Sequence, residues 1–220
     1  MRGVLRGVGR RPPALLQWEG EATVHEGKRE ILLGVATAVA PFDWARSASW
    51  DRTLGMAAER IMLIRQDGGW TQTEGNWTPM PAAAAQHERA QFALYGLMLL
   101  APLRDRGAAV SRLPDRDGLR GLAVAHPKAP PTQLWFDSAD RLREARNVVP
   151  HPEGGAPVAQ LFRFSAEPAA THPKWPRRLR IEQNGKPYLD LAFTRFRAVA
   201  HGSPVPTAPP NPTGSAIPGA

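Results

Sequence analysis

Apolar and polar residues alternate in the first part of the chain. Between residues 15 and 24 the polar positions are Gln17, Glu19, Glu21 and Thr23, and the apolar or small positions are Leu16, Trp18, Gly20, Ala22 and Val24. Because the side chains of a β-strand point alternately to opposite faces, this pattern predicts a strand with one buried face. Further strands are expected at 30–39 and 44–50, where Trp44, Arg46, Ala48 and Trp50 share one side.

A β-hairpin is predicted for residues 177–196. Leu179 and Ile181 alternate with charged residues before Asn184-Gly185, and the returning strand has apolar residues at every second position, at Leu189, Leu191 and Phe193. Asn-Gly between two alternating segments is typical of a tight hairpin turn. Asp67-Gly68 and Gly75-Asn76 indicate further turns.

One long helix is predicted at 82–100, where helix-forming residues follow two prolines. Its first half is polar, and we expect His87 and Glu88 there to lie on a solvated surface. Its second half is apolar nearly all round, since Phe92, Tyr95 and Leu99 share one side while Leu94, Leu97 and Met98 cover much of the rest. Such a segment must be enclosed on more than one face, which a curved sheet can do and a flat one cannot.

From residue 108 onward, short strand patterns resume, separated by turns. Short connections favour antiparallel pairing, because parallel strands need a long crossover. We therefore predict a mainly β (α+β) fold of about ten strands. Its strongly curved antiparallel sheet, or incomplete β-barrel, wraps one principal helix.

Composition divides the chain into three parts. The 220 residues include 23 Pro and 20 Gly, but also seven Trp and an apolar fraction of 42%, which is enough for a real core. We expect a flexible basic N-terminus at 1–13, a single β domain at 14–199 and a disordered Pro-rich tail at 200–220.

The charge pattern argues against nucleic-acid binding. Four of the arginines behind the net charge of +8 stand in the first 13 residues, at Arg2, Arg6, Arg10 and Arg11. Elsewhere basic residues are interspersed with acidic ones, which is typical of a solvated face. No membrane span is expected either, because the longest apolar run, at 92–103, is shorter than the roughly 20 residues that a bilayer requires.

The compartment depends on what precedes the sequence. The N-terminus has no apolar signal segment, so we expect a periplasmic protein if a signal peptide is missing from this chain and a cytoplasmic one otherwise. The absence of cysteine excludes disulfides and thiolate chemistry and fixes no compartment.

No catalytic motif is recognisable in the sequence. It has no phosphate-binding glycine loop, no nucleophile elbow and no histidine pair at metal-binding spacing, so we expect no enzyme activity, no cofactor and no metal. Asp115 and Asp117 are expected to be turn residues. One enzymatic alternative is a hydrolase site formed only in the fold, for instance by His126, Asp137 and Glu144.

Large apolar side chains are abundant, and two interpretations of them remain open. They fill a packed core between helix and sheet, or they line an apolar cavity suited to acyl chains, to whose irregular shapes Met56, Met62 and Met98 would adapt the wall. For the cavity, the candidate ligand-binding residues are Trp18, Trp44, Arg46, Trp50, Phe92, Tyr95, Met98, Leu99 and Trp135.

The order of these features resembles the LolA/LolB-type fold of periplasmic lipoprotein carriers. The resemblance covers residues 14–199 and rests on the strands at "WEGEATV" and "FDWARSASW", the "DGGW" hairpin, the helix and the final hairpin "NGKPYLDLAFTRF". It implies a cavity that receives acyl chains, with Arg46 at the position of an arginine that helps to hold the lid. The partners it implies are a lipid or an acylated protein, and a membrane protein. A structural or protein-interaction module with a packed core is the alternative.

Overall fold

The computed structural model describes residues 15–54, 59–170 and 172–199. The expectations for the N-terminal segment 1–13, for the tail 200–220 and for Met56 fall outside these ranges. Among the described residues, no helix is both long and apolar enough to span a membrane.

Six strands precede the principal helix. They are β1 (Leu15–Glu26), β2 (Arg29–Ala40), β3 (Trp44–Asp51), β4 (Arg60–Arg65), β5 (Gly68–Thr73) and β6 (Asn76–Pro79). The helix α1 covers Ala82–Met98, and a short 3-10 helix, η2, covers Ala101–Arg104. The strands predicted from the alternating pattern and the long helix are thus confirmed.

The second half of the chain is again built of strands. They are β7 (Ala109–Arg116), β8 (Leu119–His126), β9 (Ala129–Phe136), β10 (Leu142–Val149), β11 (Val158–Phe164), β12 (Pro168–Ala169), β13 (His172–Pro176), β14 (Arg178–Gln183) and β15 (Lys186–Val199). Only β12 and β13 stand apart from the main sheet, as a small two-stranded sheet of their own.

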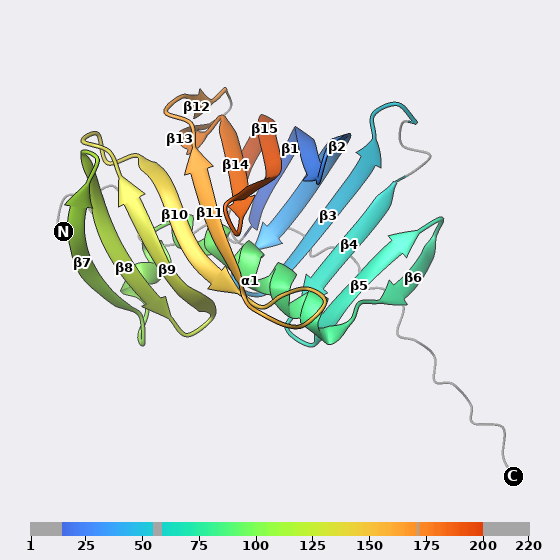
Figure 1. The fold of residues 1–220 in the computed structure, drawn as a ribbon, viewed down its shortest axis with the longest axis horizontal. Helices are drawn as coiled ribbons and strands as arrows, with labels where there is room; N and C mark the ends of the chain where they lie inside the picture. Colours follow the sequence, from blue (N-terminus) through green and yellow to red (C-terminus); the bar gives the residue numbers. More distant parts are fainter. Residues whose placement is uncertain (1–14, 55–58, 171, 200–220) are drawn as a thin grey trace, which may run out of the picture.

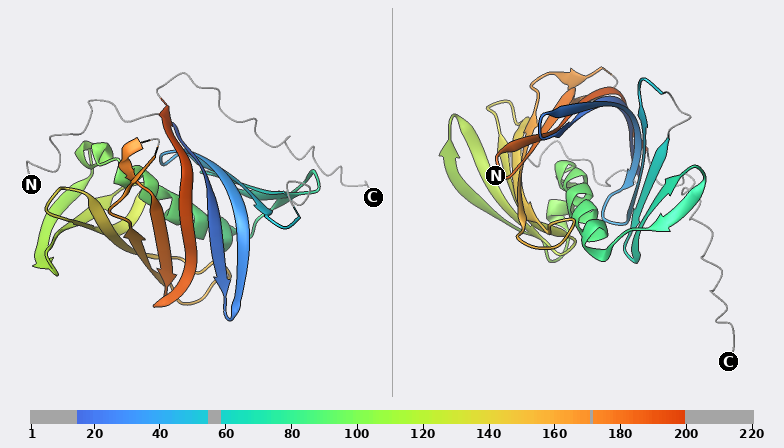
Figure 2. Two further views of the ribbon diagram at one scale, coloured as in Figure 1. Left: turned by 90° about the horizontal axis from the view of Figure 1, so that it is seen from above. Right: turned by 45° about the vertical axis from the view of Figure 1, so that its right-hand side comes forward.

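The other strands form one antiparallel sheet of 13 strands in the order β6-β5-β4-β3-β2-β1-β15-β14-β11-β10-β9-β8-β7. The pairing of β1 with β15 joins the two halves of the chain. The edge strands are β6 and β7, the two strands between which α1 lies in the sequence. The helix connects these opposite edges across the concave side, and Figure 2 shows α1 inside the curl.

Tight turns set the register of the hairpins. The predicted Asn184-Gly185 turn is confirmed, but the other two lie one residue earlier than predicted, at Gln66-Asp67 and Glu74-Gly75, because Arg65 pairs with Gly68 and Thr73 with Asn76. Asn184 and Gly185 have φ angles of 49° and 76°, which are those of a turn with two left-handed residues. The same conformation occurs at Glu74-Gly75 and at Asp117-Gly118. Asp117 is therefore a turn residue, as expected, whereas Asp115 lies within β7, at the register shift between Leu113 and Arg116.

The sheet encloses α1 on three sides. On one side, a Cβ atom at Gly69 of β5 would lie 2.9 Å from the Cβ of Ala85. On a second side, the Gln160 side chain of β11 donates a hydrogen bond of 2.9 Å to Gln91. On the third, the rings of Tyr95 and Trp18 of β1 lie 4.7 Å apart. The prediction that the helix is enclosed on more than one face is confirmed.

The polar first half of α1 is enclosed as well, which corrects the expectation of a solvated surface there. His87 is only 2% exposed and Glu88 is half-buried. The physical reason is the connection between β10 and β11, which crosses this part of the helix and accepts a hydrogen bond of 2.7 Å from the His87 Nδ1 at the carbonyl oxygen of Pro150. Figure 1 shows this connection in front of α1.

Candidate functional site

The register of the strands defines which side chains face the helix. Residues directly opposite each other in adjacent antiparallel strands point to the same face. Trp18 contacts Tyr95 of the helix and therefore lies on the concave face. Thr37 of β2 pairs with Trp18, Ser47 of β3 with Thr37, and Met62 of β4 with Ser47, so these three residues lie on the concave face as well.

One part of the concave face is tightly packed by aromatic rings. The indole of Trp175 lies 4.0 Å from the ring of Phe196 and 6.4 Å from that of Trp18, measured between ring centroids. Phe193 packs edge-on against both indoles at 6.1 Å. Trp18, Tyr95, Trp175, Phe193 and Phe196 are all at most 5% exposed. This part of the interior is a solid core.

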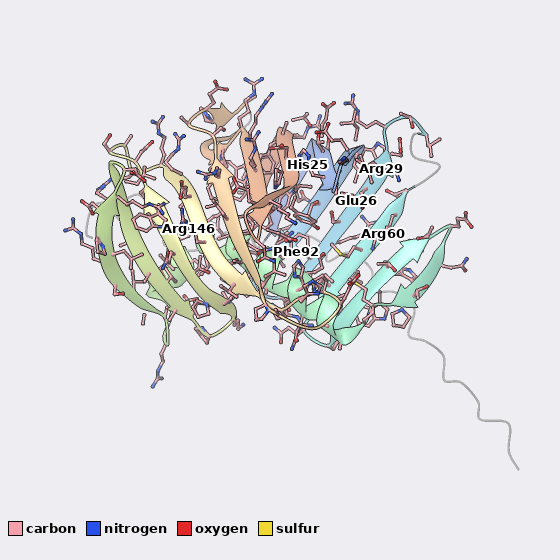
Figure 3. All side chains as sticks on the ribbon, in the orientation of Figure 1. His25, Glu26, Arg29, Arg60, Phe92 and Arg146 are labelled. Atoms are coloured by element: carbon pink, nitrogen blue, oxygen red, sulfur yellow. The ribbon has the colours of Figure 1, made fainter. Side chains whose placement is uncertain are left out.

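The other part of the concave face is less filled. It lies towards the β1–β2 turn, and its apolar side chains are only half-buried. From the strands it includes Val24, Ile31, Leu33, Val35, Met62 and Leu189, and from the helix it includes Phe92. We call this set, with Glu88 and Arg60, the open end. In Figure 3, Phe92 lies on the helix, and His25, Glu26, Arg29 and Arg60 lie at the neighbouring strand ends.

The carboxyl group of Glu88 is half-buried at the open end, near the charge of Arg60. Burial raises its pKa to about 7, although the positive charge of Arg60 acts in the opposite direction. Burial also raises the pKa of Tyr188 to about 12, with a further contribution from the nearby Glu88 charge, and it raises the pKa of Tyr95 in the same way. The carboxyl thus lies half-buried beside partly exposed apolar side chains, an environment that favours its neutral form.

Next to the open end, His87 and Gln91 attach the helix to the second half of the sheet. The Gln183 side-chain nitrogen lies 3.5 Å from Nε2 of His87, while Nδ1 is bound to the Pro150 carbonyl oxygen. Burial lowers the pKa of His87. The imidazole is therefore a neutral structural group, and its contacts hold the helix in place beside the open end.

The opposite end of the concave face is closed by a contact between distant segments. Phe42, in the turn between β2 and β3, stacks on His126 with ring centroids 4.5 Å apart. The same ring packs against Gly96 of the helix, where a Cβ atom would lie 2.6 Å from Phe42 Cζ. Phe42 thus fills the space where the two ends of the curled sheet approach each other.

Three of the predicted ligand-binding residues lie on the convex face. The register pairs Trp44, Arg46 and Trp50 with Ala40, Ala38 and Gly34 of β2, which alternate with the concave positions Thr37 and Val35. Their expected place on the cavity wall is therefore corrected. The sequence showed that they share one side of a strand whose other side carries Ala45, Ser47, Ser49 and Asp51. The more apolar side was therefore expected to face inward, whereas the register places it on the convex face.

Trp135 also lies on the convex face rather than on the expected cavity wall. It pairs with Glu144 on one side and Gly121 on the other, and a Cβ atom at Gly121 would lie 2.6 Å from its ring. The guanidinium of Arg116 covers the ring at 4.4 Å from its centroid. The indole is only 6% exposed because this cation and the neighbouring strand bury it.

The other predicted residues do face the interior or belong to the helix. Trp18 and Tyr95 are parts of the packed aromatic cluster, and each is 4% exposed. Phe92, Met98 and Leu99 are half-buried against the core. Of the predicted set, Phe92 is the residue that the structure places at the open end.

Sequence reasoning missed most of the open end. Leu33 and Val35 could have been found by extending the face of Trp18 across the β1–β2 turn, because they pair with Ala22 and Gly20. Arg60 and Glu88 gave no signal, since only the fold brings β4 beside the first turns of α1.

The residues proposed for a hydrolase site do not come together. His126 lies at the hairpin end of β8, where its Nε2 is 3.7 Å from a carboxylate oxygen of Asp105. Asp137 follows the far end of β9 and pairs with Arg141 at 2.9 Å. Glu144 pairs with Arg116, Arg146 and Arg163 at 2.6, 3.3 and 3.0 Å. The two carboxylates are thus engaged in ion pairs on the sheet, and within the described ranges no group of acidic and histidine side chains could hold a metal ion.

Known structures resemble this chain in fold. No family model matches the sequence, and no curated protein matches it. A LolA superfamily protein from Nitrosomonas europaea has a TM-score of 0.57 at 13% identity, over 92% of this chain and 94% of that one. A DUF1329 family protein from Desulfovibrio piger has a TM-score of 0.56 at 10% identity, over 91% and 92%.

A third structure comes from Vibrio parahaemolyticus and is described as an outer membrane lipoprotein-sorting protein domain. Its TM-score is 0.52 at 10% identity, over 89% of this chain and 88% of that one. These matches extend over nearly the whole length on both sides, and they agree with the curled antiparallel sheet around one helix described above. The protein therefore has the fold of the LolA superfamily.

Proposed function

We propose that the protein is a non-enzymatic carrier that binds an acyl chain at the open end of its concave face, in the bacterial cell envelope. The observation that carries the proposal is the uneven filling of the interior. Trp18 and Tyr95 are buried in a solid core, whereas Leu33, Val35 and Phe92, on the same concave side, remain half-buried. Partly exposed apolar side chains that face inward provide a surface that an apolar ligand can cover.

The chemistry of the open end suits a lipid better than a polar substrate. Its side chains are mainly aliphatic, and methionine at position 62 is flexible enough to adapt to chains of different shape. Arg60 is exposed at the start of β4 and can pair with a fatty-acid carboxylate or a lipid phosphate. The lipoprotein-sorting domain from Vibrio parahaemolyticus, similar in fold, supports cargo of this class.

Titration with a fluorescent fatty acid such as dansyl-undecanoic acid tests the proposal. We expect saturable binding with a micromolar Kd and a blue shift of dansyl emission. Val35→Trp should weaken binding at least tenfold, because the larger ring occupies the open end. Leu32→Trp is the matched control, since Leu32 is on the same strand but points to the convex face and is 51% exposed.

Equal affinities of the two variants, or no saturable binding by the wild type, would contradict the proposal. Native mass spectrometry of the purified protein supplies an independent measurement. A copurified lipid should appear as a mass increment that Val35→Trp reduces and Leu32→Trp retains.

A further inference from the structure

The convex face of the sheet has two chemically different regions. Over β1, β14 and β15 it is polar, with side chains such as Glu19, Glu21, Arg178, Arg180 and Arg195. Over β2 to β6 it is apolar and aromatic. The convex positions there are Glu30, Leu32, Gly34, Ala36, Ala38, Ala40, Trp44, Arg46, Ala48, Trp50, Ile61, Leu63, Arg65, Gly68, Trp70, Gln72, Trp77 and Pro79. We call the second region the tryptophan face.

The tryptophan face departs from the usual pattern of an antiparallel sheet. Such sheets commonly pack one face on the core and keep the other polar. Here Ile61 and Leu63 are 8% and 4% exposed although they point away from the helix. Four half-buried indoles, those of Trp44, Trp50, Trp70 and Trp77, surround them.

Two of the four indoles pack closely against glycines. A Cβ atom at Gly34 would overlap the ring of Trp50, so this indole lies flat on β2. Trp70 lies against Gly68, 3.1 Å from the position of a Cβ atom there, and the Arg65 guanidinium is 5.9 Å from its ring centroid. The face is thus an aromatic layer that also carries cations.

A basic groove borders the tryptophan face. It has a volume of about 520 Å³ and lies on the convex side of β1, β15, β14 and β11. Its charged lining consists of four arginines and two acids, Arg52, Arg163, Arg178, Arg180, Glu21 and Asp190. Leu32 and Arg52 belong to the lining as well as to the edge of the tryptophan face, which makes the two regions continuous.

Both regions carry a net positive charge, since two acids face four arginines in the groove and Glu30 is the acidic residue at the convex positions of the tryptophan face. At the convex positions of β3, β4 and β5, all of them within the described ranges, there is no acidic side chain, and Arg46 and Arg65 are the charged residues. Arg65 pairs with Asp67 of the β4–β5 turn at 3.1 Å. In the groove, Arg52 pairs with Glu21 at 3.1 Å and Arg180 with Asp190 at 2.6 Å. Arg163 pairs with Glu144 at 3.0 Å and with Glu182 at 3.1 Å, both outside the lining. Arg178 makes no ion pair in the part of the chain that the structure describes.

We propose that the tryptophan face and the basic groove together dock the protein on a membrane that contains anionic phospholipids. Indole rings prefer the headgroup region of a bilayer, where an apolar body and a polar N–H are both accommodated. Arginines near the surface are attracted by anionic headgroups, and their guanidinium groups match phosphate geometry. The exposed Leu32, between the aromatic layer and the groove, reaches the acyl boundary.

The docking surface rests on the proposed function only in its biological purpose, since a carrier has to approach the bilayer that holds its cargo. Its test is separate. Vesicle binding is measured on ligand-free protein by cosedimentation, with phosphatidylcholine vesicles and with vesicles that contain 30% phosphatidylglycerol. We expect binding to the anionic vesicles, weakened at least fivefold by 0.5 M salt, and little binding to the neutral ones.

Two variants and two matched controls locate the surface. Leu32→Glu and Arg178→Glu should each weaken binding to the anionic vesicles at least tenfold. Val148→Glu is matched to the first, because Val148 is 56% exposed on the convex side of β10, outside both regions. Arg106→Glu, between η2 and β7, is matched to the second by charge. Both controls should bind within twofold of the wild type.

The fatty-acid titration, carried out without vesicles, should give the same Kd for all four variants and for the wild type. Loss of vesicle binding with retained fatty-acid binding supports the docking surface. No sedimentation of the wild type with any vesicle overturns it in favour of a protein partner, whether or not the fatty acid binds. Equal losses of vesicle binding in the two variants and the two controls also overturn the proposed docking surface.

Discussion

Phe42 and His126 stack with their ring centroids 4.5 Å apart, although they come from opposite halves of the chain. Phe42 belongs to the turn between β2 and β3, and His126 ends β8. The sheet connects these strands only by a long path through β1, β15, β14, β11, β10 and β9. Their contact therefore shows how far the sheet curls, and it closes one end of the concave face while the other end stays open.

Phe42→Ala should destabilise the protein by about 2 to 3 kcal/mol, less than a fully buried phenylalanine because Phe42 is half-buried. The loss has two sources, the stacking on His126 and the packing on Gly96. Urea unfolding followed by circular dichroism measures it. Phe42→Leu keeps part of the packing and should cost less than half as much. A cost below about 0.5 kcal/mol for the alanine variant would mean that the contact does not hold the two ends together.

Phe162 and Phe92 provide a comparison of core and open end with the same chemical change. Phe162 is completely buried on β11, so Phe162→Ala should cost about 3 to 5 kcal/mol. Phe92 is half-buried at the open end and gives up fewer contacts, so Phe92→Ala should cost about 1 to 2 kcal/mol. Denaturant unfolding of both variants gives the two values. Equal costs would show that the interior is packed at both positions, as the structural alternative requires.

Local patterns were sufficient to predict most of the fold. Alternation identified β1, β2 and β3, and Asn184-Gly185 identified the β14–β15 hairpin, because strand direction and turn conformation depend on neighbouring residues. The enclosure of α1 followed from its apolar second half. Its first half was misjudged, because burial of His87 and Glu88 depends on the β10–β11 connection, which is remote in sequence.

The candidate site was predicted less well, for a reason visible in β3. Alternation assigns Trp44, Arg46 and Trp50 to one face, but apolar character alone does not tell which face is concave, because the concave face of β3 carries mainly serines and an aspartate. The register across several strands decides that question. Trp135 was misplaced for the same reason, since its burial comes from the Arg116 guanidinium and not from the core.

His87 should make the protein less stable at acidic pH. Burial lowers the pKa of its imidazole in the folded protein below the ordinary 6.5, so the unfolded chain binds a proton first as the pH falls. The stabilising contribution of the neutral ring is complete above about pH 7 and is lost as the pH falls below 6.5. Urea unfolding at several pH values between 5 and 7.5 should show this slope, and His87→Gln should remove it. A slope unchanged in the variant would assign it to another group.

Glu88 should make the protein less stable as the pH rises, which is opposite to the effect of His87. Burial raises the pKa of its carboxyl in the folded protein to about 7 from an ordinary 4.5, so the folded state binds the proton more tightly than the unfolded one. Its contribution to stability is present below pH 4.5 and is lost as the pH rises through 7. A pKa difference of this size changes the free energy of unfolding by about 1 to 3 kcal/mol once the partial solvent contact of Glu88 is taken into account.

Glu88→Gln separates this effect from that of His87, because a neutral amide cannot lose a proton. We expect the variant to be more stable than the wild type at pH 8 and about equal to it at pH 4.5, as measured by urea unfolding at both values. Arg60→Gln is the complementary change. It removes the positive charge that favours the Glu88 carboxylate, so the loss of stability should shift to higher pH. A difference between wild type and Glu88→Gln that does not grow from pH 4.5 to pH 8 would mean that Glu88 is accessible to water, and that the open end is wider and wetter than an acyl-chain site requires.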